Sequence, residues 1–440
     1  MHYPQSQQPL PTRSRLLRIV LSNIGTLGDI NPLIAIALEL KRRGHTPVMA
    51  LPAVYRSRIE PLGIEFHPIR PDIDPNNTIL VEMIYDVKKG TERGLRDFLY
   101  PVLRHTYDDL LQAATQPVRA DLLLLGELNY AGPIVAEATG IPWASYVLAP
   151  FSFFSAFDPP VLPPYPRLAR ADKLPAMGRA MRRLARFVTR KWPQPVYDLR
   201  RELGLPTGPN PIFDAKHSPH LVLALFSRAL GIEQKDWPAN TLITGFCFYD
   251  SDAGNSSLPP NLEEFLNAGE PPIVFTLGSA AVLAAGPFYE ISAKAAMRLG
   301  VRAVLLIGSD PRNRPQQQLP SSICVAEYAP FTALFPRAAA VVHQGGVGTT
   351  AQCLRAGAPM LIMPYSHDQP DNARRMSRLK VSRTVQRSRY KPARVARIIA
   401  ALLENPGYTA RAKAAASVLA WEDGVKNACD ALEHLHARHK

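Results

Sequence analysis

The sequence predicts an α/β protein built from two parallel-sheet domains. The first strand, 16–21, leads through a loop into a helix over 32–43 and then into a second strand, 46–51. This strand–helix–strand order is typical of a parallel sheet. A second strand, glycine loop and helix begin at 272, and a chain of 440 residues is too long for one ordinary hydrophobic core.

The composition along the chain divides it into five regions. Residues 1–15 are polar and proline-rich and are expected to form a disordered tail, and 16–247 form the N-terminal domain. A segment rich in Ser, Asn and Pro follows, and we interpret 248–270 as a linker. The second domain is expected over 271–420, with a C-terminal helix over 421–440 packing back on the N-terminal domain.

The N-terminal half alternates helices with short apolar strands. In the first helix, Pro32 suits the first helical position, Asn31 suits the cap, and Gly44 ends the helix. The remaining elements follow from amphipathic periods and from buried apolar runs. The predicted helices are 54–62, 78–88, 94–115 and 131–139, and the predicted strands are 65–69, 120–125, 143–148, 220–227 and 241–246.

Two segments of this half have unusual compositions. Residues 149–174 are rich in Pro, Phe and Tyr without a period, so they either line a pocket or pack on the surface. The predicted helix 177–192 is basic. One stripe carries its apolar residues and arginines cover the rest; the stripe is Met177, Met181, Leu184, Val188 and Trp192. We expect the apolar stripe to face the core, and contact with an anionic membrane is the alternative.

The second half contains the motif around which the chain can be arranged, the sequence HQGGVGTT that begins at His343. It follows a strand over 338–342 and precedes a helix over 351–355. Free backbone N–H groups and the helix dipole would form an anion site there, to which His343 can also donate. The alternative is a structural turn with a core histidine. The other predicted strands of this half are 272–277, 303–307, 323–326 and 360–363, with a helix over 287–299.

The last of these strands ends in a loop over 364–372 that is rich in side chains able to bind hydroxyl groups. Asp368 and Gln369 form a carboxylate–amide pair within it. Open α/β sheets bind ligands at the carboxyl ends of their strands. An anion site and this pair on successive strand ends would together suit a sugar phosphate.

Charge and cysteine content limit the possible partners and compartments. The net charge of +14 indicates an anionic partner, but no nucleic-acid motif accompanies it, and we expect no nucleic acid. The four cysteines show no CxxC pairing, which favours free thiols in a reducing cytoplasm. Neither a signal peptide nor a run of 18 apolar residues is present, so a cytoplasmic protein is expected.

The glycine loop and the loop at 364–372 together resemble the donor-binding motif of family 1 glycosyltransferases, the group that uses UDP-sugars and has the GT-B fold. The bacterial macrolide, glycopeptide and sterol branch is the most similar. The resemblance implies two Rossmann-like parallel-sheet domains that face each other across a cleft. The N-terminal domain would bind the acceptor and the C-terminal domain the nucleotide sugar.

The resemblance also assigns donor-binding roles to individual residues. Tyr328 falls where relatives stack an aromatic ring on uracil, and His343 matches the histidine that binds the diphosphate. Gln352 stands near a glutamate that holds the ribose hydroxyls, and Asp368 and Gln369 match the pair that holds the sugar. The full set of implied donor residues is Gly28, Ser279, Tyr328, His343, Gly345, Gly346, Val347, Gly348, Thr349, Gln352, Asp368 and Gln369.

The catalytic base implied by the resemblance is Asp29. Bacterial relatives often carry G-D-x-x-P at the end of the first strand, as Gly28 to Pro32 do here. A carboxylate in hydrogen-bond reach can take the proton of an attacking hydroxyl. The alternative is that Asp29 only caps a helix. Glu127 is the nearest candidate for an assisting group, and the implied acceptor-binding residues are Tyr146, Phe151, Phe153 and Phe154.

The implied reaction is the transfer of a hexose to a hydroxyl of an apolar phenolic, polyketide or sterol-like acceptor, with inversion and without a metal ion. The expected hexose is glucose and the expected donor is UDP-glucose. No Asp-x-Asp metal motif stands at a suitable place, and the UDP-sugar is a co-substrate, so no cofactor is expected. Two alternatives stay open, a catalytically silent sugar-nucleotide-binding partner protein and a sugar-nucleotide epimerase. A dehydrogenase is disfavoured, because no GxGxxG follows the first strand.

Overall fold

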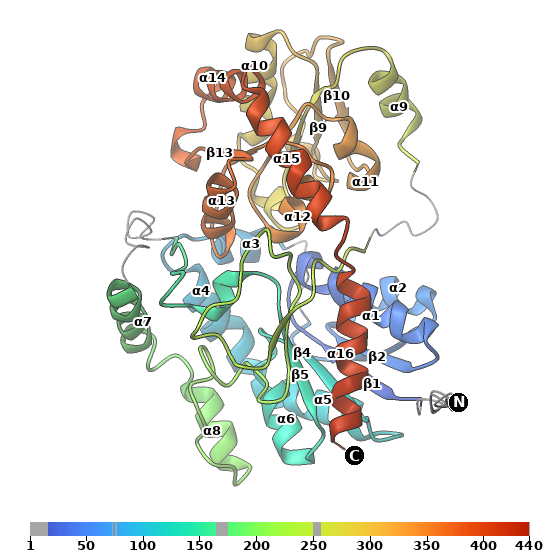
Figure 1. Cartoon of the computed structure of the whole chain (residues 1–440), viewed down its shortest axis with the longest axis vertical. Helices are drawn as coiled ribbons and strands as arrows, with labels where there is room; N and C mark the ends of the chain where they lie inside the picture. Colours follow the sequence, from blue (N-terminus) through green and yellow to red (C-terminus); the bar gives the residue numbers. More distant parts are fainter. Residues whose placement is uncertain (1–15, 73, 75–76, 164–174, 250–256, 440) are drawn as a thin grey trace, which may run out of the picture.

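The computed structural model describes residues 16–72, 74, 77–163, 175–249 and 257–439. The expected tail over 1–15 lies outside these residues. Figure 1 shows two α/β domains, with the blue-to-green N-terminal half below and the yellow-to-red C-terminal half above. Within the described ranges, no helix has both the length and the apolar character needed to span a bilayer.

Each domain is built on one parallel sheet. The N-terminal sheet has seven strands in the order β3-β2-β1-β4-β5-β6-β7, and the C-terminal sheet has six in the order β10-β9-β8-β11-β12-β13. The bounds are β1 (Arg18–Ser22), β2 (Thr46–Leu51), β3 (Glu65–Pro68), β4 (Leu122–Gly126), β5 (Trp143–Val147), β6 (Val222–Ala224), β7 (Thr241–Ile243), β8 (Ile273–Thr276), β9 (Ala303–Leu306), β10 (Ile323–Ala326), β11 (Ala340–His343), β12 (Met360–Ile362) and β13 (Ser382–Thr384). The predicted α/β class and parallel sheets are therefore confirmed.

Helices cover both sheets. Those of the N-terminal half are α1 (Leu27–Arg42), α2 (Arg56–Ile59), α3 (Thr78–Ile84), α4 (Gly90–Arg93), α5 (Leu103–Thr115), α6 (Gly132–Thr139), α7 (Pro175–Val188) and α8 (Gln194–Glu202). Those of the C-terminal half are α9 (Pro260–Asn267), α10 (Phe288–Leu299), α11 (Phe331–Leu334), α12 (Val347–Arg355), α13 (Gln369–Arg378), α14 (Pro392–Leu403), α15 (Pro406–Leu419) and α16 (Gly424–Arg438).

The strand order of each sheet reverses at one point. In the N-terminal sheet the reversal lies between β1 and β4, and in the C-terminal sheet it lies between β8 and β11. The crevice outside the carboxyl ends of the strands at such a point is where open α/β sheets bind ligands. The fold thus provides two candidate crevices, one in each domain.

Several expected boundaries were wrong, and three of them change the description of the fold. Helix α1 begins at Leu27 rather than at 32, so Pro32 lies inside it and Asn31 is not its cap. The proposed linker 248–270 contains helix α9, whose Leu262 and Leu266 are buried in a core cluster. The expected loop 364–372 is only partly a loop, because helix α13 begins at Gln369.

The C-terminal helix α16 packs on the N-terminal domain. It lies against α1, and Figure 1 shows it running down from the end of α15 to the lower domain. Cys429 and Leu432 of α16 share a hydrophobic cluster with Leu33 and Ile36 of α1. Arg43 reinforces this contact with ion pairs of 2.7 Å to Asp430 and 3.1 Å to Glu433.

A buried arginine joins the two domains directly. Arg375 on α13 is 4% exposed and pairs with Asp371 on the same helix and with Asp158 of the N-terminal domain, at 2.7 and 2.6 Å. The Val161 N–H of the N-terminal domain also donates to Asp371. Arg378 binds the other oxygen of Asp158 from a more exposed position.

The depth of Arg375 predicts its effect on stability. Replacing Arg375→Met should lower the free energy of unfolding by about 3–5 kcal/mol, because two carboxylates in the domain contact lose their cation. Arg378→Met is the matched control, since this 40% exposed cation pairs with the same Asp158, and about 1 kcal/mol or less is expected. Urea unfolding of the full chain measures both, and equal losses would contradict the assignment of the contact to Arg375.

Candidate active site

Asp29 lies in the first turn of α1, directly after β1. Both of its cap contacts go to Oδ2, which accepts from the Thr26 N–H at 2.8 Å and from the Thr26 hydroxyl at 3.0 Å. This is a capping box, in which Thr26 is the N-cap and Asp29 the third helical residue. A Cβ at Gly25 would lie 2.5 Å from the same oxygen, so Gly25 leaves the space that this carboxylate fills. The helix-capping alternative is therefore part of the structure.

The environment of Asp29 changes its acidity. Burial raises the pKa of Asp29 to about 6, the Thr26 hydrogen bonds act in the opposite direction, and the charge of Glu127 raises the pKa further. A carboxylate with this pKa is a stronger base than an exposed aspartate and is still mostly ionised at neutral pH. The site therefore provides a base of suitable strength.

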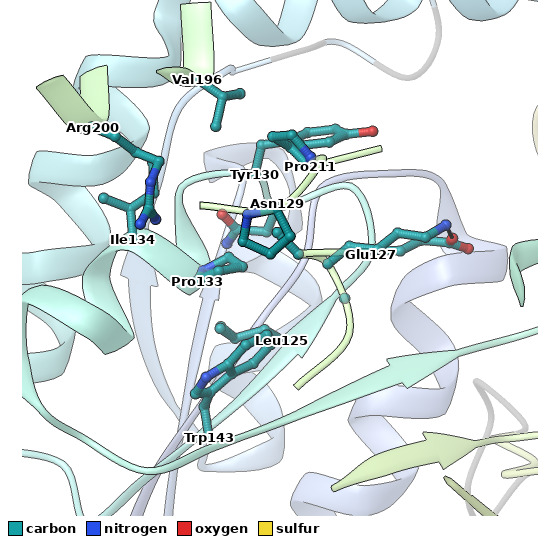
Figure 2. Close-up of a pocket in the computed structure, with 14 residues that line it drawn as sticks. Leu125, Glu127, Asn129, Tyr130, Pro133, Ile134, Trp143, Val196, Arg200 and Pro211 are labelled. Atoms are coloured by element: carbon teal, nitrogen blue, oxygen red, sulfur yellow. Dashed lines mark hydrogen bonds and ion pairs between the residues drawn. The ribbon is translucent and has the colours of Figure 1, made fainter. Parts of the chain in front are cut away.

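Glu127 follows β4 and is bound by other groups. Its Oε1 accepts from the Ser152 hydroxyl at 2.7 Å, and its Oε2 pairs with Lys216 at 2.8 Å. In Figure 2, the Glu127 side chain extends away from Tyr130 and Pro133, which line the same small cavity. This cavity measures about 20 Å³, room for roughly one water molecule. Glu127 acts on Asp29 through its charge.

His343 ends β11 and is fully buried. Its Nδ1 accepts from the Gly345 N–H at 3.0 Å, and burial lowers its pKa to about 3, so the ring is neutral. A neutral ring whose Nδ1 accepts carries its proton on Nε2. Among the described residues, Nε2 has no hydrogen-bond partner. A buried donor without a partner is costly, and a ligand at this strand end would satisfy it.

The N-terminus of α12 adds further donors beside His343. Gly346 is the N-cap and makes no side-chain cap bond, and the first helical bond runs from Thr350 N–H to Gly346 O. The amides of Val347, Gly348 and Thr349 precede that bond and are the donors that helix ends leave for anions. The sequence therefore folds here into the predicted strand–loop–helix arrangement.

Glycine is required at one position of this loop. Gly345 has φ +93°, and a Cβ there would lie 2.8 Å from Ile362. The loop is tied to the end of β8 by Gln344, whose Oε1 accepts from the Gly278 N–H at 2.9 Å. The two strands at the C-terminal reversal point thus share one hydrogen-bonded rim.

Asp368 is the N-cap residue of α13, opposite Asp29. Its Oδ2 accepts a hydrogen bond from the Asn372 amide. The same amide donates to the Gly345 carbonyl, so Asn372 connects the loop after β12 to the glycine loop after β11. Burial raises the pKa of Asp368 to about 7, and the charge of Asp29 contributes to the increase. The fold thus brings together carboxylates from the two domains.

Tyr85 of the N-terminal domain contacts the C-terminal domain near these carboxylates. It follows α3, and its ring packs edge-on against Tyr365 at 5.7 Å between centroids and lies 5.8 Å from His367. Burial raises the pKa of the Tyr85 hydroxyl, and the charges of Asp368 and Asp29 raise it further. This tyrosine therefore borders both carboxylates.

Known proteins match this chain over nearly its whole length. Residues 19–154 match the glycosyltransferase family 28 N-terminal domain, and residues 296–424 match the erythromycin biosynthesis protein CIII-like C-terminal domain. The chain is 31% identical over 438 residues to O-mycaminosyltylonolide 6-deoxyallosyltransferase of Streptomyces fradiae, covering 95% of this chain and 97% of that protein.

The chain belongs to the GT-B glycosyltransferases of family 1. A sterol 3-beta-glucosyltransferase of Arabidopsis thaliana is 30% identical over 373 residues, which is 80% of this chain and 55% of the plant protein. The structure of the kitacinnamycin glycotransferase has a TM-score of 0.70 at 22% identity and covers 96% of this chain and 99% of its own. The structural similarity concerns the fold, and it confirms the predicted GT-B architecture.

Of the other implied donor residues of this glycosyltransferase, three lie in the C-terminal domain after β10, after β8 and on α12. Tyr328 follows β10 and is 53% exposed, and Ser279 is exposed in the loop after β8. Gln352 lies on α12 beyond the phosphate loop, partly exposed. Gln369 is turned inward instead, because its Oε1 accepts from the Tyr365 and Ser366 N–H groups. Gly28 is exposed on the facing domain, in the first turn of α1.

Two of the four implied acceptor residues are core residues. Tyr146 is 1% exposed, and its hydroxyl donates to the Asp29 carbonyl, so it supports the turn from below. Phe153 is 4% exposed and stacks on Trp237 at 4.1 Å. Neither ring has appreciable exposed surface in this structure, and the acceptor role of these two stays a prediction. Phe151 and Phe154 are partly exposed and stay candidates.

Sequence reasoning missed four residues that shape the site. Thr26 had a detectable signal, the T-x-x-D spacing of a capping box. Gln344 and Asn372 stood inside the recognised motifs, but their loop-bridging bonds depend on the folded positions of other strands. Tyr85 carried no signal, because its partners belong to the other domain.

Among the described residues, no group of three or more His, Cys, Asp or Glu side chains is placed to hold a metal ion. The donors beside the end of β11 are instead N–H groups, from His343 and the first turn of α12. An arrangement of this kind stabilises negative charge through oriented dipoles.

The two nitrogens of His343 can be tested separately. His343→Ala should weaken UDP binding by about ten- to a hundredfold in calorimetry, since it removes a hydrogen bond to a charged group. His343→Gln places an amide N–H near the Nε2 position and should retain part of the affinity. His343→Asn can still accept from Gly345 and should bind as weakly as His343→Ala. The reverse order of the Gln and Asn variants would contradict a ligand-binding Nε2.

Proposed function

We propose that this glycosyltransferase moves a hexose, glucose, from UDP-glucose to a hydroxyl of an apolar acceptor, with inversion and without a metal ion. The observation that carries the proposal is Asp29, a raised-pKa carboxylate at the N-terminal reversal point that faces Asp368 across the cleft. His343 and the α12 amides lie on the same side as Asp368. The proposed base thus lies next to the proposed sugar site, and the sugar site lies next to the proposed diphosphate site.

The proposed chemistry is a single displacement. Asp29 takes the proton of the acceptor hydroxyl as its oxygen forms a bond to the anomeric carbon. The bond from that carbon to the diphosphate breaks at the same time, and the leaving group keeps the electron pair. Attack from the face opposite the leaving group inverts the configuration. His343 Nε2–H and the amides of Val347 and Gly348 would stabilise the charge that develops on the diphosphate.

The acceptor and sugar classes are inferred from the relatives. One curated relative is named for transfer to a sterol and another for transfer to O-mycaminosyltylonolide. These names support an apolar acceptor of the polyketide or sterol-like kind, and the word glucosyltransferase supports glucose. The four free cysteines fit a reducing cytoplasm. Rates with UDP-glucose and dTDP-glucose would test the nucleotide, to which Gln352 is expected to bind through the ribose.

The proposed base predicts how Asp29→Asn behaves. Asn preserves the size of the side chain and can still accept hydrogen bonds from Thr26. Because the pKa of Asp29 is raised in the folded protein, its ionisation above pH 6 destabilises the fold, and Asn removes this cost. The fold should therefore be retained. Transfer to an aliphatic alcohol should fall about 10²–10⁴-fold. The loss should shrink for acidic phenols, which ionise without a base. Equal losses for both acceptors would indicate a positioning role instead.

The pKa of Asp29 also predicts a pH profile. Because Asp29 must be ionised to accept a proton, kcat/KM should fall on the acid side with a midpoint near pH 6. The Thr26 hydroxyl lowers this pKa, so Thr26→Val should move the midpoint to higher pH, whereas Thr26→Ser should leave it in place. If the midpoint of the acid-side fall is the same in Thr26→Val and Thr26→Ser, the fall does not report the ionisation of Asp29.

A further inference from the structure

Helix α7 is attached to the protein by its charged face. Arg186 forms two hydrogen bonds to Asp214, at 2.9 and 2.5 Å, and Arg182 pairs with Asp236 at 3.4 Å. Gly178 is the buried contact point of the helix, since a Cβ there would lie 2.1 Å from the Ala156 carbonyl. The arginines expected to face solvent thus include the two that hold α7 in place.

The apolar stripe of α7 faces outward. Met177, Leu184, Phe187 and Val188 are 48%, 60%, 62% and 60% exposed. Their spacing places them on one side of the helix, which is the pattern of a face that is normally buried. The expectation of a core-facing stripe was therefore wrong for Met177, Leu184 and Val188. It holds for Trp192, which lies beyond the end of α7 and packs against a core cluster. Figure 1 shows α7 at the left edge of the molecule, away from both sheets.

Cations border this apolar face. Arg179 and Arg183 are exposed on the helix, the exposed Arg190 and Lys191 follow it, and α7 contains no acidic residue. A cavity of about 310 Å³ opens beside the helix and is lined by Arg179, Arg182, Arg183, Arg186, Asp236, Ala156 and Phe157. The excess of arginine over the single carboxylate makes this cavity cationic. The net charge of the whole chain is also positive, at +14.

We propose that α7 is a membrane-docking element that binds the surface of an anionic phospholipid bilayer. An exposed apolar stripe with a basic border and no acidic residue is the arrangement of a helix that lies in the lipid interface. Leu184, Phe187 and Val188 would enter the acyl boundary. Arg179 and Arg183 would contact lipid phosphates, and the arginine-lined cavity beside them has room for a headgroup.

The apolar stripe and its basic border together indicate which kind of partner binds α7. A nucleic acid would use the cations but leave the apolar stripe in water, and a purely apolar protein surface would leave the arginines without anions. An anionic bilayer satisfies both, because acyl chains and phosphates lie within one helix diameter of each other. The docking surface is separate from Asp29 and His343, so the proposal stands independently of the proposed reaction.

Docking at α7 would orient the enzyme. Gly178 contacts Ala156, which belongs to the segment that follows the partly exposed Phe151 and Phe154. The same segment reaches Asp158 at the domain contact. Binding through α7 would therefore place the acceptor side of the cleft near the lipid surface, where apolar acceptors concentrate.

Vesicle co-sedimentation of the full chain tests the proposal. The protein should bind vesicles of phosphatidylcholine mixed with phosphatidylglycerol more tightly than vesicles of phosphatidylcholine alone, and added salt should weaken this binding. The double substitution Arg179→Gln with Arg183→Gln should reduce affinity about thirtyfold, from the contribution of two surface cations. Leu184→Glu with Phe187→Glu should abolish binding.

The control replaces equally exposed apolar residues elsewhere. Val118→Glu with Val418→Glu changes the charge by the same amount at residues that are 60% and 50% exposed, and should bind vesicles far better than the α7 variant. Circular dichroism shows whether each variant folds. Absence of binding to anionic vesicles, or equal loss in both glutamate variants, would overturn the proposal. A change of oligomeric state in the α7 variant, without a change in lipid binding, would assign the face to a protein contact instead.

Discussion

Parallel strands impose the constraint from which both halves of the site follow. Each crossover returns the chain to the same edge, so the carboxyl ends of all strands in a sheet lie together. Asp29 and Glu127 follow the two strands at the N-terminal reversal point, and Ser279 and His343 follow or end those at the C-terminal one. Helix α16 and the buried cluster around Arg375 hold the domains so that these two edges face each other.

The facing edges bring two buried carboxylates close together, and burial, hydrogen bonds and neighbouring charges together set their pKa values. Asp29 receives two hydrogen bonds from Thr26, and Asp368 receives one from Asn372. Hydrogen bonds to the ionised form lower a pKa. Accordingly the pKa of Asp29 is raised only to about 6, while that of Asp368 reaches about 7. The charge of Asp29 adds to the increase at Asp368, so the two carboxylates influence each other across the domain boundary.

The sequence predicted the features that local pattern determines. Short apolar runs between glycines located the strands, and the HQGGVGTT motif located the loop after β11. The start of α1 was misplaced because Pro32 suggested a first helical position and obscured the capping box at Thr26. Periodicity showed that α7 has an apolar face, but not where it points, because Asp214 and Asp236 come from distant segments. Tyr85 likewise depends on a contact between domains.

In the proposed reaction, one residue in the first turn of α1 both caps a helix and serves as the base. The cap contacts of Asp29 use only Oδ2, which leaves Oδ1 for an acceptor hydroxyl. Gly25 is needed because a side chain there would occupy the place of that carboxylate. Pro32 has no amide to donate to the Gly28 carbonyl, so this carbonyl stays outside the helical bonding pattern at an exposed position. Glycine, threonine and aspartate at this spacing thus fix a carboxylate by one oxygen only, and the proposed base function would use the other.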